Sequence, residues 1–243
     1  WTDNYPIFKL INTLVIVPTY NEVDNIQKFI DSVFLIDGLS LLVVDDNSPD
    51  GTAKIVESNF ENYQNLHLLK REGKLGLGSA YIEGFKWFLN SNYSYCLQMD
   101  GDFSHSFNDL NSILNNKHDG DLVIGSRYTV GGSTEGWSIY RRLLSKYANI
   151  LSRAILSSKI NDLTGGFNLL SREVVREIIN LGPSSNGYTF LMEIKNLIEK
   201  KGFKIKEVPI TFVERESGKS KMNYQIVFEA IKFLLKNIFK KYN

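Results

Sequence analysis

The sequence contains a single cysteine, Cys96, among 243 residues, so it cannot form an internal disulfide. This scarcity predicts a protein that folds in a reducing compartment. Because Cys96 lies within an apolar segment, we expect a small buried side chain rather than a nucleophile. The three histidines are scattered and match no zinc-binding spacing.

Long apolar runs and a strong net charge are also missing. No uninterrupted apolar segment approaches the roughly 18 residues needed to span a membrane. No basic region followed by an apolar core marks a signal peptide, so a cytosol-facing protein is predicted. The net charge of +1 argues against a nucleic-acid-binding protein that relies on bulk electrostatics. With 43% hydrophobic and 23% charged residues, the composition is that of an ordinary globular protein.

Short apolar segments alternate with helical patterns through the first half of the chain. Strands are predicted at residues 13–17, 41–44, 66–69, 95–99 and 122–124. Helices are predicted at residues 23–35, from Thr52, and at residues 76–89. Because the strands are apolar throughout and separated by helices, they indicate a mostly parallel sheet covered on both faces.

The second half of the chain is less regular. We expect a mobile glycine-rich loop at residues 131–136, a long helix at 139–156 and a turn at Gly165-Gly166. Further helices are predicted at residues 172–180, 189–201 and 224–242. A strand is predicted at residues 205–213, where Pro209 indicates an edge or a bulge.

The strand predicted at residues 95–99 ends in Asp100-Gly101-Asp102. In an open α/β sheet, ligands bind at the carboxyl ends of the strands. Two carboxylates on a tight turn there supply hard oxygen ligands for a divalent cation that also binds a diphosphate. For an isolated Asp-Gly-Asp a hydrated acidic turn would be the preferred interpretation, but three other segments of this chain favour the metal site.

Polar and acidic residues follow the first two predicted strands as well. In Pro18-Thr19-Tyr20-Asn21-Glu22, an aromatic ring can stack on a base and a carboxylate can accept from a base or ribose. Asp45 and Asp46 end the second strand, where carboxylates commonly contact ribose or a base edge. Alternatively, Asn21, Asp46 and Asp50 cap the helices that follow. Three acidic strand ends on one edge of a sheet favour a nucleotide site.

Motifs along nearly the whole chain, from about Leu14 to Met222, resemble a known family. Those that resemble the family 2 glycosyltransferases are Val17 to Glu22, Val44 to Thr52, Asp100 to His105 and Gly125 to Tyr128. Those that resemble the dolichol-phosphate mannose synthases within that family are Gly136-Trp137, Asp162 to Phe167, Gly187-Tyr188 and Gly218 to Met222. The resemblance implies a single GT-A domain, with a Rossmann-like, mostly parallel sheet flanked by helices. A nucleotide-sugar half (residues 13–125), an acceptor half (126–223) and a C-terminal amphipathic helix (224–243) are expected.

The resemblance further implies an inverting, metal-dependent transfer of mannose from GDP-mannose to dolichyl or another polyprenyl phosphate. The product is then a β-linked mannosyl phospholipid. The residues implied to hold guanosine are Pro18, Tyr20, Glu22, Val44 and Asp46. Those implied to hold the diphosphate and Mg²⁺ or Mn²⁺ are Asp100, Gly101 and Asp102, with Asp102 as the nearest ligand. Arg127, Arg215 and Lys221 are implied to contact the donor phosphates and the acceptor phosphate.

The chain departs from the family pattern after the Asp-Gly-Asp. Ser104 stands where some relatives have a metal-binding glutamine, and serine is a weaker ligand, so water is expected to fill part of that role. Ser106-Phe107 replaces the more usual His/Asp-Pro, which leaves the role of His105 open.

Two other enzyme activities are alternatives at this stage. One is the transfer of glucose from UDP-glucose to a polyprenyl phosphate, within the same family. The other is a sugar-1-phosphate nucleotidyltransferase, which would carry a glycine-rich loop ending in arginine or lysine after the first strand. Here that position holds residues 18–22 instead. The glycine-rich residues 73–78 lack the ending of a phosphate-binding loop and are predicted to cap the helix that begins at Gly76.

The chemistry of a lipid phosphate sets what the site requires. Its second pKa is about 6, so at neutral pH it is already a nucleophilic dianion and needs no strong general base. Cations are needed to bring two anions together and to stabilise the departing diphosphate. Besides Arg127, Arg215 and Lys221, the candidates are Arg141, Arg142 and Lys219, although Arg141-Arg142 equally fits a solvated helix start. Glu193 is predicted to be a polar core partner, and the role of Asp162 is open.

The final helix predicts contact with a membrane surface. It is rich in apolar residues, and Lys232, Lys236 and Lys240 recur on one face, which suits a helix lying in a membrane interface. Core packing and contact with a small membrane-spanning partner are the alternatives. We therefore expect a peripheral protein on the cytosolic face of a membrane, the endoplasmic reticulum if the source is eukaryotic.

Overall fold

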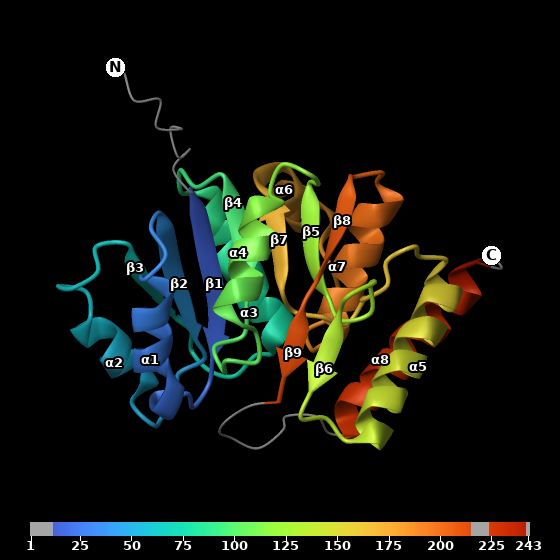
Figure 1. Ribbon diagram of the computed structural model, residues 1–243, viewed down its shortest axis with the longest axis horizontal. Helices are drawn as coiled ribbons and strands as arrows, with labels where there is room; N and C mark the ends of the chain where they lie inside the picture. The colour runs from blue at the N-terminus through green and yellow to red at the C-terminus, as the bar shows by residue number, and fades with distance from the viewer. Residues whose placement is uncertain (1–11, 215–223, 242–243) are drawn as a thin grey trace.

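The computed structural model describes residues 12–214 and 224–241. Its main feature is a seven-stranded sheet in the order β3-β2-β1-β4-β7-β5-β8 (Figure 1). These strands are β1 (Thr13–Thr19), β2 (Leu39–Asp45), β3 (Leu66–Lys70), β4 (Tyr95–Gln98), β5 (Leu122–Ser126), β7 (Asn168–Ser171) and β8 (Ile205–Pro209). Only the pairs that β7 forms with β4 and β5 are antiparallel. The predicted mostly parallel sheet is confirmed.

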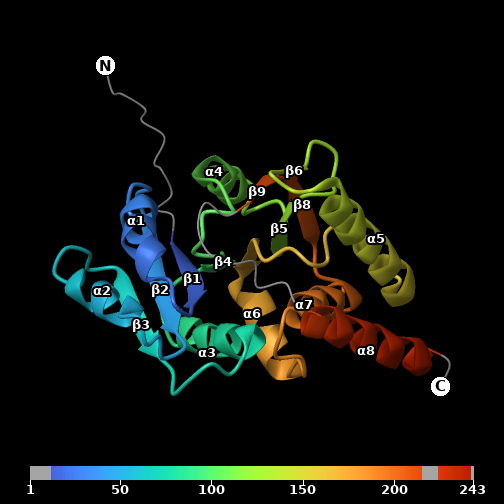
Figure 2. The same ribbon diagram turned by 90° about the horizontal axis from the view of Figure 1, so that it is seen from below.

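Helices cover both faces of this sheet, with α1 and α4 on one side and α3, α6 and α7 on the other (Figure 2). The helices are α1 (Val23–Val33), α2 (Thr52–Ser58), α3 (Leu77–Leu89), α4 (Phe107–Asn115), α5 (Ile139–Leu156), α6 (Arg172–Leu181), α7 (Thr189–Lys200) and α8 (Tyr224–Lys241). Alternate residues of β1 enter opposite cores: Val15 packs in the core with Phe29 of α1, and Ile16 in the core with Phe85 of α3. Burial on both faces explains why the strands are apolar throughout.

Three short strands depart from the prediction. The sequence analysis places no strand at β7, which inserts antiparallel between β4 and β5. The loop expected at residues 131–136 contains β6 (Ser133–Glu135), which pairs in parallel with β9 (Thr211–Val213). The single strand expected at 205–213 is divided into β8 and β9, because β8 ends at Pro209. The edge position that Pro209 indicated is confirmed, because β8 is the last strand of the sheet.

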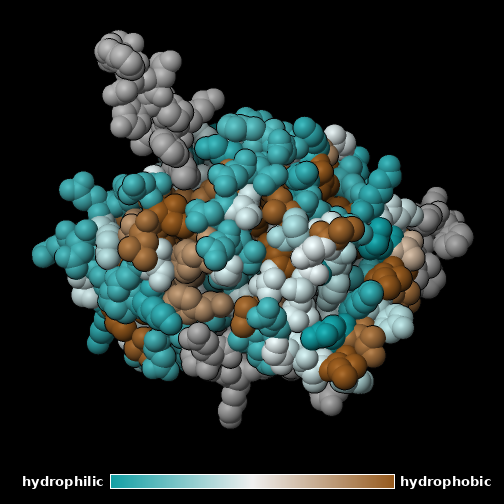
Figure 3. Space-filling model, viewed as in Figure 1, coloured by the Kyte–Doolittle hydropathy of each residue, from teal (hydrophilic) through white to brown (hydrophobic). Residues whose placement is uncertain are grey.

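Helices α5 and α8 contact each other at one end of the molecule (Figure 1). Apolar side chains that are at least 42% exposed recur along α5. They are Ile139, Tyr140, Leu143, Leu144, Tyr147, Ile150 and Leu151. Ile231 and Leu235 of α8 are exposed to a similar degree, and apolar surface gathers over this end in Figure 3. Within the described part of the chain, no helix is both long and apolar enough to cross a bilayer.

Candidate active site

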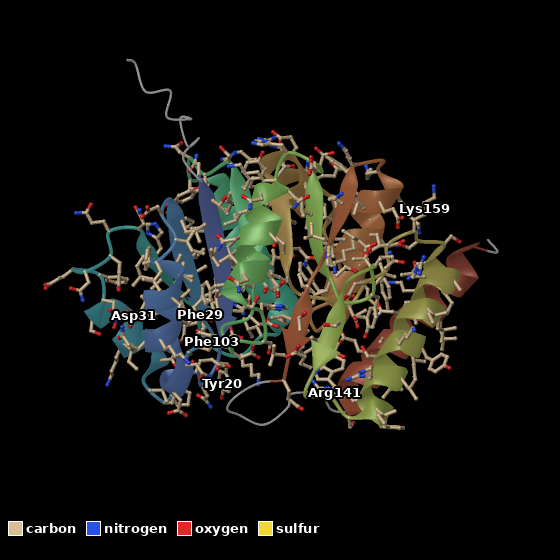
Figure 4. All side chains as sticks on the ribbon, viewed as in Figure 1. Tyr20, Phe29, Asp31, Phe103, Arg141 and Lys159 are labelled. Carbon is tan, nitrogen blue, oxygen red and sulfur yellow. The ribbon has the colours of Figure 1, made fainter. Side chains whose placement is uncertain are left out.

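The carboxyl ends of the parallel strands meet at one edge of the sheet, the lower edge in Figure 1. Tyr20 after β1 and Arg141 of α5 both lie along this edge (Figure 4). Asp46 directly follows β2, and Arg127 directly follows β5. Asp100 lies shortly after the end of β4. The structure therefore gathers the predicted strand-end residues on one side of the sheet, as the topology requires.

The Asp-Gly-Asp turn lies against β1. The Asp100 side chain is 33% exposed, whereas Asp102 is buried and accepts a 3.1 Å hydrogen bond from the Ser104 amide. A Cβ at Gly101 would lie 3.0 Å from Cγ1 of Val17, closer than most such contacts. Glycine thus lets the turn approach β1 closely, with one carboxylate accessible and the other fixed by the backbone.

Phe103, the residue after this turn, has an unusual backbone conformation. Its φ of +60° is rare for an aromatic residue, and such backbone strain persists only where the surroundings enforce it. Phe103 lies beside Phe29 (Figure 4), and its ring packs edge-on against the Phe29 ring at 5.9 Å. The Lys28 ammonium lies 4.7 Å from the Phe103 ring centroid. These contacts anchor the turn to α1.

The donor set at this turn fits a hard divalent cation. Asp100 and Asp102 offer carboxylate oxygens, and the Ser104 hydroxyl is buried without a hydrogen-bond partner among the described residues. Oxygen ligands suit Mg²⁺ or Mn²⁺. Residues 12–214 and 224–241 contain no cluster of three or more His, Cys, Asp or Glu side chains that could hold a metal. A cation bound here would therefore complete its coordination with phosphate oxygens and water.

His105 is a neutral packing residue. Its ring is 2% exposed, stacks on Phe167 at 4.5 Å and meets Phe212 edge-on at 5.1 Å. Nε2 lies 3.9 Å from Oδ2 of Asp100, too far for a hydrogen bond. Burial lowers the pKa of His105 to about 4, against the opposing charge of Asp102. His105 is therefore packed between aromatic rings, and its low pKa keeps the ring neutral at neutral pH.

We expect His105→Gln to reduce the loss of stability in acid. The pKa of His105 is about 4 in the folded protein and about 6.5 for an ordinary histidine of the unfolded chain, so between these pH values the unfolded chain binds more protons. The free energy of unfolding of the wild type therefore falls as the pH drops through this window, by about 3 kcal/mol. Urea denaturation of metal-free wild type and variant at neutral and acidic pH measures this term. Equal losses in both proteins would contradict the assignment.

Arg127 and Asp162 form a buried ion pair beside the turn. Nε and Nη2 of Arg127 donate to the two carboxylate oxygens of Asp162 at 2.7 and 2.8 Å, and the Arg127 amide donates at 3.0 Å. Although burial alone would raise the pKa of Asp162, the Arg127 guanidinium holds it well below its usual range. The structure thus answers the open question of Asp162: it positions Arg127.

Lys195 fastens the segment that carries Asp162. This fully buried ammonium donates to the carbonyl oxygens of Asp162 at 2.9 Å and Gly165 at 2.7 Å. Burial lowers its pKa to about 8, against the opposing charge of Asp162. Lys195 could not be predicted from the sequence, because a lysine on a helix normally faces solvent.

Asp46 does not cap a helix. Its carboxylate pairs with the buried guanidinium of Arg71, which also donates to Glu83 at 3.1 Å and to Ser79 at 2.6 Å. Burial raises the pKa of Asp46, and Arg71 offsets part of that rise. Arg71 follows the end of β3, and the sequence analysis does not identify it.

The other residues around β1 and β2 divide into structural and accessible ones. Asp50 accepts from the amides of Val23 and Thr52 at 3.0 and 2.9 Å, which confirms its capping role. The Val44 side chain is fully buried in the core beside α3 and cannot contact a nucleoside. The expected contact is therefore limited to the Val44 backbone. The ring of Tyr20 is accessible, with the Lys74 ammonium 4.4 Å from its centroid.

Asp45, Pro18 and Glu22 complete this edge. Asp45 is buried and accepts from the hydroxyls of Thr19 at 2.9 Å and Ser48 at 2.6 Å, so it joins β1 to the turn after β2. Pro18 and Glu22 are partly exposed. They remain candidates for nucleoside contact.

A cavity of about 290 Å³ begins at the turn and extends between the helices. Its polar end is formed by Asp100, Arg127 and Arg141. Arg141 pairs with Glu214 at 2.7 Å, and its guanidinium lies 4.2 Å from the ring centroid of Trp137. The apolar lining comes from α5 (Leu144, Ala148, Leu151), α7 (Leu191, Met192) and α8 (Ala230, Ile231, Leu234). One cavity thus joins a carboxylate and cations to a hydrocarbon-like channel.

The glycine-rich residues 73–78 serve close packing. Gly76 is the N-cap of α3 with φ of +102°, and the Gly78 amide donates to the Asn186 carbonyl at 2.7 Å. A Cβ at Gly78 would lie 2.6 Å from the Ser185 carbonyl oxygen. Glu193 is partly exposed and accepts from the Ser184 and Ser185 amides at 3.0 and 2.8 Å, so it is a polar structural partner near the surface rather than in the core as predicted. Cys96 is fully buried, as predicted.

Several predicted residues lie outside the described parts of the chain. These are Arg215, Lys219 and Lys221, together with the Gly218 to Met222 motif. The side chains of residues 224–228 and 238–241 are likewise outside. In the described part of α8, Lys232 and Lys236 are exposed, as expected for a basic face.

Comparisons with known proteins show the family of this chain. Residues 14–179 match the sequence pattern of the family described as "Glycosyl transferase family 2". The chain is 41% identical over 222 residues to "Polyprenol monophosphomannose synthase" of Mycolicibacterium smegmatis, covering 90% of this chain and 84% of that protein. It is 37% identical over 222 residues to "Undecaprenyl-phosphate mannosyltransferase" of Micrococcus luteus, covering 91% of each.

A solved structure has the same fold. It is the "Mannosyltransferase PcManGT from Pyrobaculum calidifontis in complex with GDP-Man and Mn2+", with a TM-score of 0.56 and 20% identity. The similarity covers 95% of this chain, which spans 64% of that longer one. At this identity the likeness establishes the architecture.

Proposed function

The chain belongs to glycosyl transferase family 2, and on that premise we propose that it transfers mannose from GDP-mannose to a polyprenyl phosphate with inversion. The observation that carries this proposal is the cavity that joins Asp100 and two arginines to an apolar channel between α5, α7 and α8. A donor bound through its diphosphate and an acceptor with a phosphate head and an isoprenoid tail match these two ends. The sequence relatives are named for this acceptor class.

On the donor side, we assign residues 13–125 to nucleotide-sugar binding. Pro18, Tyr20, Glu22, Asp46 and the backbone of Val44 surround the guanosine. The diphosphate and Mg²⁺ or Mn²⁺ are held by Asp100, Gly101, Asp102 and Ser104. The cation, when bound, offsets the negative charge that develops on the departing diphosphate. Asp46 keeps its pairing with Arg71, so its contribution to the nucleoside comes from a fixed carboxylate.

On the acceptor side, we assign residues 126–223 to the lipid phosphate. Arg127 and Arg141 line the polar end of the cavity, and Arg215 and Lys221 are proposed to add further positive charge. The phosphate oxygen attacks the anomeric carbon of mannose from the face opposite the diphosphate. The bond to the diphosphate breaks, its electrons leave on GDP, and one new carbon–oxygen bond forms. Because the attacking phosphate is already a dianion, no proton has to be removed.

The lipid tail requires access from a membrane. The apolar channel is lined by α5 and α8, the two helices that expose apolar side chains at this end. We propose that this end contacts the bilayer surface, with exposed Lys232 and Lys236 available for anionic headgroups. The protein then acts peripherally at the cytosolic face, alone or with a small membrane-spanning partner. Relative to the sequence prediction, the structure extends the candidate membrane surface from α8 to α5.

Radiolabelled donors test the proposed reaction directly. The protein is incubated with GDP-mannose or UDP-glucose, a short polyprenyl phosphate, and Mg²⁺ or Mn²⁺. We expect a labelled lipid from GDP-mannose that disappears in excess chelator. A labelled lipid from UDP-glucose alone would replace the proposed function with the glucosyltransferase alternative.

We expect Tyr140→Glu combined with Tyr147→Glu to weaken membrane binding without unfolding the protein. Both side chains are exposed, at 76% and 65%, and neither lines the cavity, so charge there opposes burial in lipid rather than folding. Flotation with vesicles that contain anionic lipid measures binding. Leu35→Glu is the matched control, because Leu35 is 83% exposed at the end of α1. Equal flotation of both variants and wild type would exclude α5 as the contact surface.

A further inference from the structure

Two residues that line the cavity carry buried hydroxyl groups with no hydrogen-bond partner among the described residues. The hydroxyls belong to Tyr81 of α3, which is fully buried, and Thr189 at the start of α7, which is 1% exposed. Both residues line the same cavity as Asp100. Buried polar side chains almost always have a partner, so two such hydroxyls beside one cavity indicate a ligand that supplies it.

Both hydroxyls are held on rigid elements. The Tyr81 ring stacks parallel to Phe190 of α7, with centroids 6.2 Å apart and planes 8° apart. It also packs against Phe85 at 6.1 Å. Burial raises the pKa of the Tyr81 phenol well above its usual value, and the charge of Asp100 raises it further. The phenol therefore keeps its proton and stays a hydrogen-bond donor close to the Asp-Gly-Asp turn.

The chemistry of the two hydroxyls narrows the ligand. A hydroxyl both donates and accepts, which matches the hydroxyl groups of a sugar. The acceptor phosphate needs donors and positive charge, and the same cavity provides these at Arg127, Arg141 and the indole N–H of Trp137. The isoprenoid tail offers no polar atom. A hexose attached to a diphosphate at Asp100 carries several hydroxyl groups that both donate and accept, so it matches both protein hydroxyls.

We propose that Tyr81 and Thr189 form the subsite for the transferred sugar and hydrogen-bond its hydroxyl groups. This inference rests on the proposed function, which places the donor diphosphate at the Asp-Gly-Asp turn. The subsite makes the site selective, because a sugar that lacks or inverts a matching hydroxyl leaves a buried protein hydroxyl unpaired. Selection between hexoses thus comes from α3 and α7 rather than from the nucleotide contacts.

Tyr81→Phe and Thr189→Val test the subsite, since each removes the hydroxyl with little change in shape. We expect each to lower kcat/KM for GDP-mannose by about 10- to 100-fold, with KM for the polyprenyl phosphate unchanged. Thr189→Ser, which keeps a hydroxyl, should retain most activity. The decisive comparison uses GDP-mannose analogues that each lack one sugar hydroxyl. For the analogue that lacks the matching sugar hydroxyl, the variant and the wild type should have the same kcat/KM.

Thr13→Val is the matched control, because the Thr13 hydroxyl is also buried and unpartnered among the described residues but lies at the start of β1, outside the cavity. It should leave the kinetics unchanged. The subsite is refuted if every analogue loses the same factor with variant and wild type, or if only the acceptor KM rises. Wild type that makes no lipid product from GDP-mannose refutes the proposed function and this inference together. An active wild type with fully active variants refutes the subsite alone.

Discussion

Asp102→Asn is expected to lower kcat/KM by about 10²- to 10³-fold while the protein stays folded. The substitution removes one negative charge from the proposed ligands of the cation, yet the amide oxygen can still accept from the Ser104 amide, as Asp102 does at 3.1 Å. The turn follows β4 and contributes little to the apolar cores. Steady-state kinetics with Mg²⁺ or Mn²⁺ and a thermal unfolding curve measure the two effects separately.

Asp50→Asn provides the matched control for this prediction. It makes the same chemical change on the same edge of the sheet, but Asp50 caps α1 and α2 through backbone amides. Its expected effect is a stability loss of about 1 kcal/mol with unchanged kcat/KM. Full activity of Asp102→Asn, or of wild type in excess chelator, would contradict the metal assignment.

The sheet and its acidic edge could be predicted because their signals are local. Strands β1, β2 and β4 are mostly apolar because helices cover both of their faces, and polar residues follow each of them. Parallel strands place their carboxyl ends together, so Asp46 and Asp100 could be assigned to one edge without any contact being known. The fold class follows from the same alternation.

What the sequence could not reveal depends on distant partners. Strand β7 has four residues and exists because β4 and β5 flank it, and β6 and β9 pair only with each other. From the sequence alone, Arg71 and Lys195 would be expected to face solvent. In the structure Arg71 pairs with Asp46, and Lys195 donates to two backbone carbonyls. The exposure of apolar side chains on α5 could not be predicted from the sequence either. The periodic apolar residues of α5 are typical of core packing, and only the tertiary arrangement leaves Tyr140 and Tyr147 exposed.

Arg127→Met is expected to cost about 3 kcal/mol of stability as well as activity. It leaves the fully buried carboxylate of Asp162 without its guanidinium partner, and among the described residues Lys195 is the cation that still acts on it. Breaking one side of a buried ion pair is strongly destabilising because the remaining charge stays out of water. Urea denaturation at neutral pH measures this loss. Unchanged stability would show that Asp162 is solvated in the variant.

Adding Asp162→Asn to Arg127→Met separates the structural role of Arg127 from its role in the reaction. The double variant removes both charges, so it should regain more than half of the stability that Arg127→Met loses. If Arg127 contacts phosphate in the cavity, as proposed, kcat/KM must stay low, since stabilising the fold does not restore a cation beside Asp100. Recovery of activity along with stability would instead mean that Arg127 acts by holding the segment around Asp162 in place.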